Sequence, residues 1–145
     1  MPRVYISSVI DAPAAKVWDK VRDFNALPRW HPRIRDSRIE NGEPSDKVGC
    51  VRDFHLQNGD RIREKLLGLS DYDLFCTYAI LESPMPLTDY VATLRITPIT
   101  DGDRTFAEWS ADFECAEADA EDLVAGIGAN VFQGGFDALK RHFAR

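Results

Sequence analysis

The segments CVRDFHL and RIREKLL each place one charged residue on a strand face that is otherwise apolar. Side chains alternate between the two faces of a strand, so Arg52 shares a face with Phe54, and Glu64 shares a face with Ile62. The intervening QNGD is typical of a hairpin turn. The two strands are therefore expected to pair, with Arg52 directly or diagonally opposite Glu64 and within reach of an ion pair.

An inward-facing ion pair needs an explanation, because removing charges from water costs on the order of several kcal/mol per ion. The pair could be a structural contact near the rim of the sheet, or a polar anchor inside a water-accessible cavity. In an enzyme, Glu64 would be the candidate catalytic acid/base. Burial would raise the pKa of Glu64 and Arg52 would lower it, so the sequence leaves these alternatives open.

Two later segments favour the cavity. In DYVATLRI, Tyr90 shares a face with Ala92 and two aliphatic residues, and in AEWSADFEC, Trp109 is flanked on its own face by Ala107 and Ala111. Small residues beside a large aromatic side chain leave space on the inner face of the sheet. The strands therefore predict an interior that is not completely filled.

The C-terminal segment 119–143 has the apolar spacing of a long helix but contains four glycines, Gly126, Gly128, Gly134 and Gly135. Glycine costs roughly 1 kcal/mol relative to alanine at each interior helix position. Gly128 and Gly135 fall near the centre of the apolar face. Either the helix backbone approaches large residues of the sheet closely, or the missing side chains leave a groove for a ligand. Together with the strands, the pattern favours the groove.

The elements that must position these residues follow from the same patterns. An alternating strand at 3–10 precedes a helix over 11–24, for which Asp11 is a plausible cap and Pro13 lies in the first turn. Prolines limit 25–34 to at most one helical turn. Six further strands are expected at about 34–40, 48–56, 61–69, 73–81, 89–99 and 104–115. An antiparallel meander covered by one long helix predicts an α+β fold.

Composition narrows the classes of function. The chain has 145 residues, 44% of them hydrophobic, which suits one domain with one core. A net charge of −6 argues against nucleic acid as a partner and against binding to a membrane surface. No apolar run approaches the roughly 20 residues that span a bilayer, and no secretory signal is recognisable. Three distant cysteines and three dispersed histidines predict reduced thiols, a cytoplasmic location and no metal site. No motif for a cofactor is present either.

The order of several segments is that of a known family. VWDKVRDFNALPRWHPRI, VGCVRDF, RIREKLL, SPMPLTDYVATL, TFAEWSADFE and VFQGGFDALK resemble the START-like superfamily, also called SRPBCC or polyketide cyclase/dehydrase-like. The sequence is most similar to small bacterial members whose pattern is like that of plant abscisic-acid receptors. The resemblance covers 1–145 as a single domain. It implies a helix-grip fold, in which a curved seven-stranded antiparallel sheet wraps around a long C-terminal helix and an internal apolar cavity.

The same resemblance suggests roles for individual residues. In the receptor branch, a basic residue at the position of Arg35 contacts a ligand carboxylate, and family members place polar pocket residues where Arg52, Glu64 and Tyr90 stand. The receptor gate motif is replaced here by QNGD and the latch motif by SPMPLTD. The chain is therefore not expected to be a hormone receptor. The 82–89 loop, which carries Met85, is either a mobile lid or a plain connection.

These observations predict a protein that binds a small, largely apolar or amphipathic molecule with a polar or acidic end in an internal cavity. The candidate ligand-binding residues are Trp30, Arg35, Arg52, Phe54, Glu64, Met85, Tyr90, Trp109, Phe132, Gly135 and Phe136. The alternative is a cyclase, aromatase or dehydratase-like enzyme that uses the same cavity. A third hypothesis is an interaction module with a collapsed interior. An exposed strand edge is compatible with a homodimer, but no feature requires one.

Overall fold

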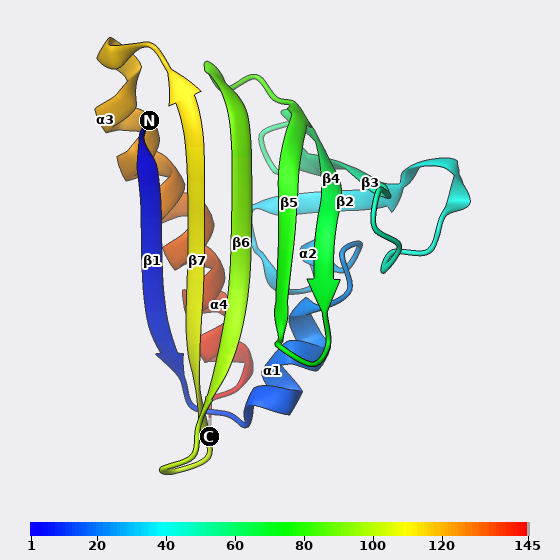
Figure 1. The fold of residues 1–145 in the computed structure, drawn as a ribbon, viewed down its shortest axis with the longest axis vertical. Coiled ribbons are helices and arrows are strands. Elements are labelled where there is room, and N and C mark those ends of the chain that lie inside the picture. The colour runs from blue at the N-terminus through cyan, green and yellow to red at the C-terminus, as the bar shows by residue number, and fades with distance from the viewer. Residues whose placement is uncertain (145) are drawn as a thin grey trace.

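A computed structural model describes residues 1–144 and contains one seven-stranded antiparallel sheet. Along the chain the strands are β1 (Arg3–Ile10), β2 (Ile34–Ile39), β3 (Val51–Leu56), β4 (Arg61–Ser70), β5 (Phe75–Glu82), β6 (Leu87–Ile99) and β7 (Arg104–Cys115). Their order in the sheet is β1-β7-β6-β5-β4-β3-β2, so the first two strands of the chain form its two edges. The sheet is strongly curved, and β2 and β3 run across the direction of the other strands in Figure 1.

The helices occupy the inner face of this curve. A short connection, α1 (Ala14–Val21) and α2 (Leu27–Trp30), carries the chain from one edge strand to the other. The C-terminal helix consists of α3 (Glu117–Gly126), a π-helical segment η2 (Ile127–Gln133) and α4 (Gly134–His142). Figure 1 shows this helix running along the far side of β1, β7 and β6. The arrangement is the helix-grip fold, and the α+β prediction is confirmed.

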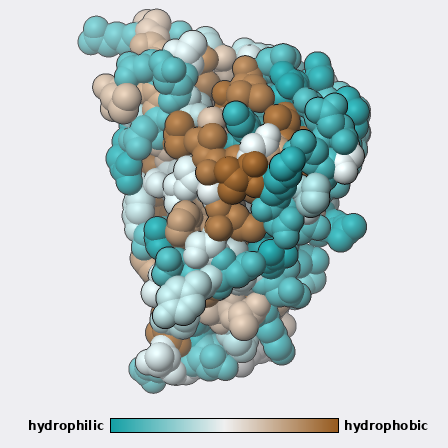
Figure 2. Space-filling view, turned by 45° about the vertical axis from the view of Figure 1, so that its right-hand side comes forward, coloured by the Kyte–Doolittle hydropathy of each residue, from teal (hydrophilic) through white to brown (hydrophobic). Residues whose placement is uncertain are grey.

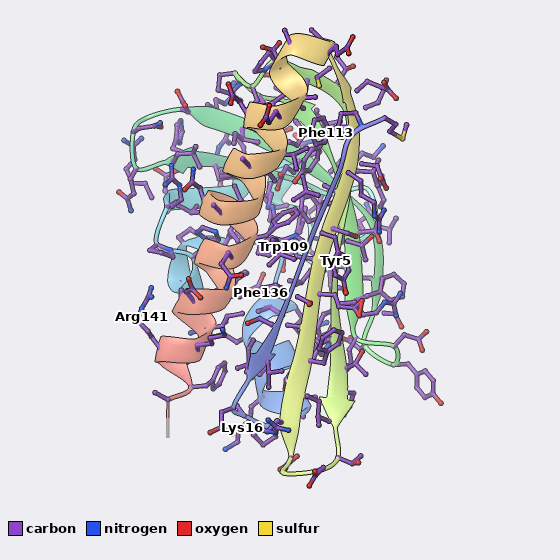
Figure 3. The ribbon with its side chains drawn as sticks, turned by 90° about the vertical axis from the view of Figure 1, so that its left-hand side faces the viewer. Tyr5, Lys16, Trp109, Phe113, Phe136 and Arg141 are labelled. Carbon is purple, nitrogen blue, oxygen red and sulfur yellow. The ribbon has the colours of Figure 1, made fainter. Side chains whose placement is uncertain are left out.

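Alternation in the sequence explains why the strands form and how they face. Along β7 every second side chain is buried, whereas those between them are partly exposed. The buried set is Thr105, Ala107, Trp109, Ala111 and Phe113. The opposite face of the sheet carries polar and charged residues, as expected for an antiparallel sheet with one covered side. Figure 3 shows Trp109 and Phe136 directed into the space between sheet and helix.

The predicted bounds differ from the structure at a few points. The strand expected at 48–56 begins at Val51, and the helix expected over 11–24 is reduced to Ala14–Val21. The N-cap position of that helix is Pro13 and not the expected Asp11. The long helix expected over 119–143 spans Glu117–His142, but its centre is π-helical, which the apolar spacing did not predict.

Candidate ligand-binding site

A cavity of about 240 Å³ lies between the inner face of the sheet and the C-terminal helix. Strands β3 to β7 supply one wall, and Leu123, Ile127 and Val131 supply the other. Most of the lining is aliphatic or aromatic. Its exposed lining residues, which mark the mouth, are Arg33, Asp60, Pro84, Asp122 and Asn130. The structure therefore contains the mostly apolar pocket, with a few polar groups, that is typical of small-molecule sites.

Arg52 and Glu64 form an ion pair inside this cavity. They lie directly opposite each other in the β3–β4 ladder, and each is only 6% exposed. The Arg52 Nε–H donates to Glu64 Oε1 over 2.9 Å, and Nη2 lies 2.7 Å from the same oxygen. Nη1 donates to the backbone carbonyl of Phe24 over 3.1 Å. The ion pair expected from the alternation of the two strands is present.

Aromatic rings surround the Arg52 guanidinium. Its central carbon lies 3.9 Å from the centroid of the Phe24 ring, 4.8 Å from that of Tyr78 and 5.6 Å from that of Phe54. A cation over an aromatic face gains electrostatic attraction, and more so where water is excluded. Arg52 is thus held on several sides by groups of the protein itself.

Glu64 is less completely engaged than its partner. Both of its contacts with Arg52 fall on Oε1, and Oε2 receives no hydrogen bond from residues 1–144. Every fully buried polar side-chain atom among these residues has a hydrogen-bond partner, so Oε2 must be accessible from the cavity. Burial raises the pKa of Glu64, and the neighbouring Arg52 opposes this effect. The cavity therefore presents one carboxylate oxygen as a free hydrogen-bond acceptor.

Three aromatic residues from neighbouring strands extend the polar end. The Trp109 Nε1–H donates to the Tyr78 hydroxyl over 3.0 Å. Burial raises the pKa values of the Tyr78 and Tyr90 hydroxyls above their usual range, so both are protonated near neutral pH. Tyr78, Tyr90, Trp109 and Glu64 all line the cavity. The polar groups are therefore gathered on the sheet side of the cavity.

The predicted site residues fall into two groups. Those that line the cavity are Arg52, Phe54, Glu64, Met85, Tyr90 and Trp109. Those that do not are Trp30, Arg35, Phe132, Gly135 and Phe136. The first group comes mainly from strands, where alternation determines the face to which each side chain points. The second comes mainly from the helical segments, where the sequence predicts an apolar face but not what that face meets.

Phe132 and Phe136 pack behind the cavity instead of forming its wall. The Phe132 ring stacks on Trp109 at 4.6 Å between centroids, and Phe136 lies 5.8 Å from the same ring. Both phenylalanines are completely buried. Trp30, expected at the entrance, is also buried and lies 5.9 Å from Trp109. These rings form an aromatic cluster with Trp109, which alone among them reaches the cavity.

Gly135 belongs to the same cluster and does not leave room for a ligand. A Cβ atom there would lie 2.9 Å from Trp109 Cζ3, 3.0 Å from His31 Cδ2 and 3.1 Å from Trp30 Cζ3. The close-approach interpretation of this glycine is correct. Gly126 is the helix glycine that lines the cavity, and a Cβ atom there would meet nothing within 4 Å.

Arg35 points away from the cavity. It lies on edge strand β2, is half exposed, and its Nε–H donates to Asp36 over 3.3 Å. The basic residue of this segment that lines the cavity is Arg33, two positions earlier and before the strand begins. Arg35 therefore does not line the cavity as expected, because the pairing of β2 with β3 shifts register between Ile34 and Asp36 and this bulge interrupts the alternation of the strand at Arg35.

His31 is a residue whose role the sequence did not reveal. It is 1% exposed and lines the cavity next to the π-helical segment. The Arg33 backbone N–H donates to Nδ1 over 3.3 Å, so Nε2 carries the proton and donates to the Val131 carbonyl over 2.7 Å. Burial lowers the pKa of His31 and favours this neutral form. The histidine thus supplies a partner to a carbonyl within η2.

Tyr78 and Phe24 were also not identified from the sequence. Tyr78 could have been, because alternation in FCTYAIL places it on the face of Cys76 and Ile80. Phe24 follows a helix end, and its contact with Arg52 depends on the path of the loop.

Comparison with known proteins places the chain in a family. A family model described as "Polyketide cyclase / dehydrase and lipid transport" matches residues 1–144, and the chain belongs to this family. The resemblance to START-like proteins is thereby confirmed. No curated protein is a significant match to the sequence.

Solved structures agree with this assignment. XoxI from Bacillus cereus is 29% identical, with a TM-score of 0.87 over 99% of this chain and 96% of that one. A Thermobifida fusca protein is 30% identical, with a TM-score of 0.91 over 100% and 95% of the two chains. Ginseng major latex-like protein 151 from Panax ginseng is 16% identical, with a TM-score of 0.79 over 99% and 97%, which shows the shared fold alone.

Residues 1–144 contain no group of His, Cys, Asp and Glu side chains that could hold a metal ion. None of their helices is both long enough and apolar enough to cross a membrane.

Proposed function

We propose that this protein binds a small, largely apolar molecule whose polar end is neutral and donates a hydrogen bond to Glu64. The observation that carries the proposal is the apolar cavity with an accessible Glu64 Oε2 at its polar end. Apolar burial supplies most of the binding energy, at about 25 cal/mol per Å². The family description, which includes cyclases and lipid transport, is consistent with such a ligand.

The cavity limits the size of the ligand. Its volume of about 240 Å³ exceeds the roughly 150 Å³ of an engineered apolar cavity that binds benzene. It falls below the range of about 300–1,000 Å³ for sites that take drug-sized molecules. The ligand part inside the cavity is therefore about one aromatic ring with substituents, or two fused rings.

The charges of the cavity favour a neutral polar end. Arg52 already contacts a carboxylate, a carbonyl and several aromatic rings. A ligand carboxylate beside this pair would also approach Glu64, and like charges repel strongly where water is excluded. A hydroxyl or N–H group would instead donate to Glu64 Oε2. This proposal narrows the sequence-based expectation of a polar or acidic end to a neutral hydrogen-bond donor.

The test uses three probes with one ring system and different ends. Calorimetric titration with 2-naphthol, naphthalene and 2-naphthoate compares a hydroxyl, no polar group and a carboxylate. We expect 2-naphthol to bind most tightly, because naphthalene leaves the buried carboxylate oxygen without a donor, at a cost of about 1–3 kcal/mol. We expect 2-naphthoate to bind most weakly. Tightest binding of 2-naphthoate would show that Arg52 selects acidic ligands, and failure of all three would refute an aromatic ligand of this size.

A second function, catalysis, is favoured by the state of Glu64. A buried carboxyl with a raised pKa that faces a cavity is suited to act as a general acid or base. If the protein is a cyclase or dehydratase, Glu64→Gln should abolish turnover of a bound polyketide-like substrate while ligand affinity changes little. Equal loss of turnover and affinity would instead assign Glu64 to binding.

A further inference from the structure

Strands β5 and β6 separate where they approach the loop that joins them. They pair from Phe75–Arg95 to Ala79–Val91 and no further. Yet β5 continues to Glu82 along β4, and β6 begins at Leu87 along β7. Figure 1 shows the two strands diverging toward their connection. The sheet is therefore open over one end of the cavity.

A bulge in β6 lies directly beside Tyr90, at the edge of this opening. Asp89 adopts a positive φ of 54°, and the pairing of β6 with β7 shifts register between Thr88 and Val91. Such a backbone conformation is uncommon for residues other than glycine, and β-bulges often redirect a side chain next to a functional site. Tyr90 is 3% exposed and lies on the same inward face as Ala92 and Leu94, immediately after this irregularity.

A polar groove lies outside the opening, between the β3–β4 turn and the start of β6. Ile80 and Tyr90 line both this groove and the internal cavity, as do Asp60 and Pro84 at the rim. The two spaces are therefore neighbours that share a boundary of side chains. The remaining groove residues include Arg61, Glu82, Ser83, Thr88 and Asp89.

The groove presents more hydrogen-bond acceptors than available donors. Its guanidinium, Arg61, is committed to Asp53, with contacts of 2.9 and 2.8 Å. Its carboxylates are Asp60, Glu82 and Asp89. Glu82 is paired with Arg63 and lies 3.9 Å from Arg61, and Asp60 accepts a hydrogen bond from Asn58 over 3.2 Å. A hydroxyl-rich group can donate to such carboxylates, whereas an anionic group would be repelled.

The groove and the sheet face beside it are not uniformly polar. Leu81 lines the groove and is 45% exposed, and Leu67 and Val91, on the outward-facing side of β4 and β6, are 42% and 40% exposed. Figure 2 shows hydrophobic residues gathered on this face, surrounded by hydrophilic ones. Aliphatic carbon beside carboxylates suits a group that has both C–H and O–H surfaces, such as a sugar.

We infer that the groove is a second compartment of the binding site, which holds a hydroxylated substituent of the ligand while the apolar ring lies in the cavity. This inference rests on the proposed function. Movement of the Ile80 and Tyr90 side chains would join the two compartments. The ligand class is then a glycoside or polyol conjugate of a small aromatic molecule, and a larger one than the cavity alone could hold.

The experiment compares 2,6-dihydroxynaphthalene with its mono-β-D-glucoside and its mono-β-D-glucuronide by calorimetry. Each conjugate keeps one free phenolic hydroxyl for Glu64. We expect the glucoside to bind at least as tightly as the aglycone, and the glucuronide to bind at least tenfold more weakly than the glucoside. Thr88→Trp fills the groove without altering a cavity residue. It should weaken the glucoside at least tenfold and change the aglycone less than twofold.

Two control variants test whether the sugar lies in the groove or leaves the cavity elsewhere. Thr97→Trp makes the same change at an exposed position of β6 outside the groove and should alter neither affinity. Asn130→Trp narrows the cavity mouth. If Asn130→Trp, but not Thr88→Trp, weakens the glucoside, the substituent leaves through the mouth and the inference is wrong. It is also wrong if the aglycone binds and the glucoside does not. If neither binds, the proposed function fails and the groove inference with it.

Discussion

Replacing Gly135 with alanine tests whether the aromatic cluster, and not a ligand, accounts for this glycine. The added Cβ would lie 2.9 Å from Trp109, 3.0 Å from His31 and 3.1 Å from Trp30. At Gly134, the adjacent position in the same helix, the nearest atom is the Ala129 carbonyl oxygen at 3.6 Å, which is an ordinary contact. The two substitutions therefore make the same chemical change in different surroundings.

The expected difference follows from two opposing effects. Alanine is favoured over glycine inside a helix by roughly 1 kcal/mol, and this gain applies about equally at both positions. Overpacking of a filled core costs about 1–3 kcal/mol, and this applies only where three rings must move. Gly134→Ala should therefore stabilise the protein. Gly135→Ala should be less stable than Gly134→Ala by about 1–3 kcal/mol.

Urea unfolding followed by tryptophan fluorescence and by circular dichroism measures this difference. Gly126→Ala serves as a second control, since its Cβ would meet nothing within 4 Å. If Gly135→Ala is as stable as Gly134→Ala, the space around Gly135 is not filled, and the argument from the three aromatic contacts is refuted. An unchanged m-value is required for the comparison, because it shows that both variants unfold from an equally compact state.

Three further predictions concern buried titratable groups. Glu64→Gln should lower the free energy of unfolding by about 3–5 kcal/mol, because it leaves the buried charge of Arg52 uncompensated. The double variant Arg52→Leu/Glu64→Leu should recover most of this loss, and urea unfolding measures both variants. Arg61 and Arg38 hold the pKa of Asp53 at about 2, against an ordinary value of 3.8. The stability that the Asp53 carboxylate confers should therefore be lost as pH falls from about 4 through 2. Asp53→Asn should be less stable than wild type at pH 7, and the two proteins should be equally stable near pH 2. The lowered pKa of His31 means that the unfolded chain takes up a proton first, so wild-type stability should fall as pH drops below about 6.5. His31→Asn should reduce this dependence of stability on pH, as measured by thermal unfolding from pH 5 to 8. An unchanged pH profile would show that His31 does not cause the dependence.

The strands could be predicted well because one rule governs both their existence and their direction. Alternation and the hairpin turn placed Arg52 directly or diagonally opposite Glu64, and alternation directed Trp109 inward; both features are present. Side chains on a strand point to one of two faces, so a correctly predicted strand leaves only two possible directions for each side chain. The rule fails at Arg35, where a register shift between Ile34 and Asp36 interrupts the alternation of β2; the expectation of a ligand contact there came from resemblance and not from alternation.

The helical part of the site could not be predicted to the same degree. The apolar face of the C-terminal helix was recognised, but Phe132, Phe136 and Gly135 meet other aromatic residues and not the cavity. The distance and angle between helix and sheet decide which part of an apolar face is covered and by what. The spacing of residues within one segment predicts neither of these quantities. The contact of His31 with Val131 joins residues 100 positions apart and lies where the helix departs from α-helical geometry, which the apolar spacing did not predict.

That departure has a consequence for comparing related sequences. An α-helix turns by about 100° per residue, so adding or removing one residue rotates everything that follows to another face. The wide turn at Ile127–Gln133 absorbs such a change, which leaves Phe136 and Leu139 directed at the core. Relatives that lack the turn should be one residue shorter in this helix and should have no need of a histidine at the position of His31. Alignments that force these helices to equal length would misplace every position from Gly134 onward.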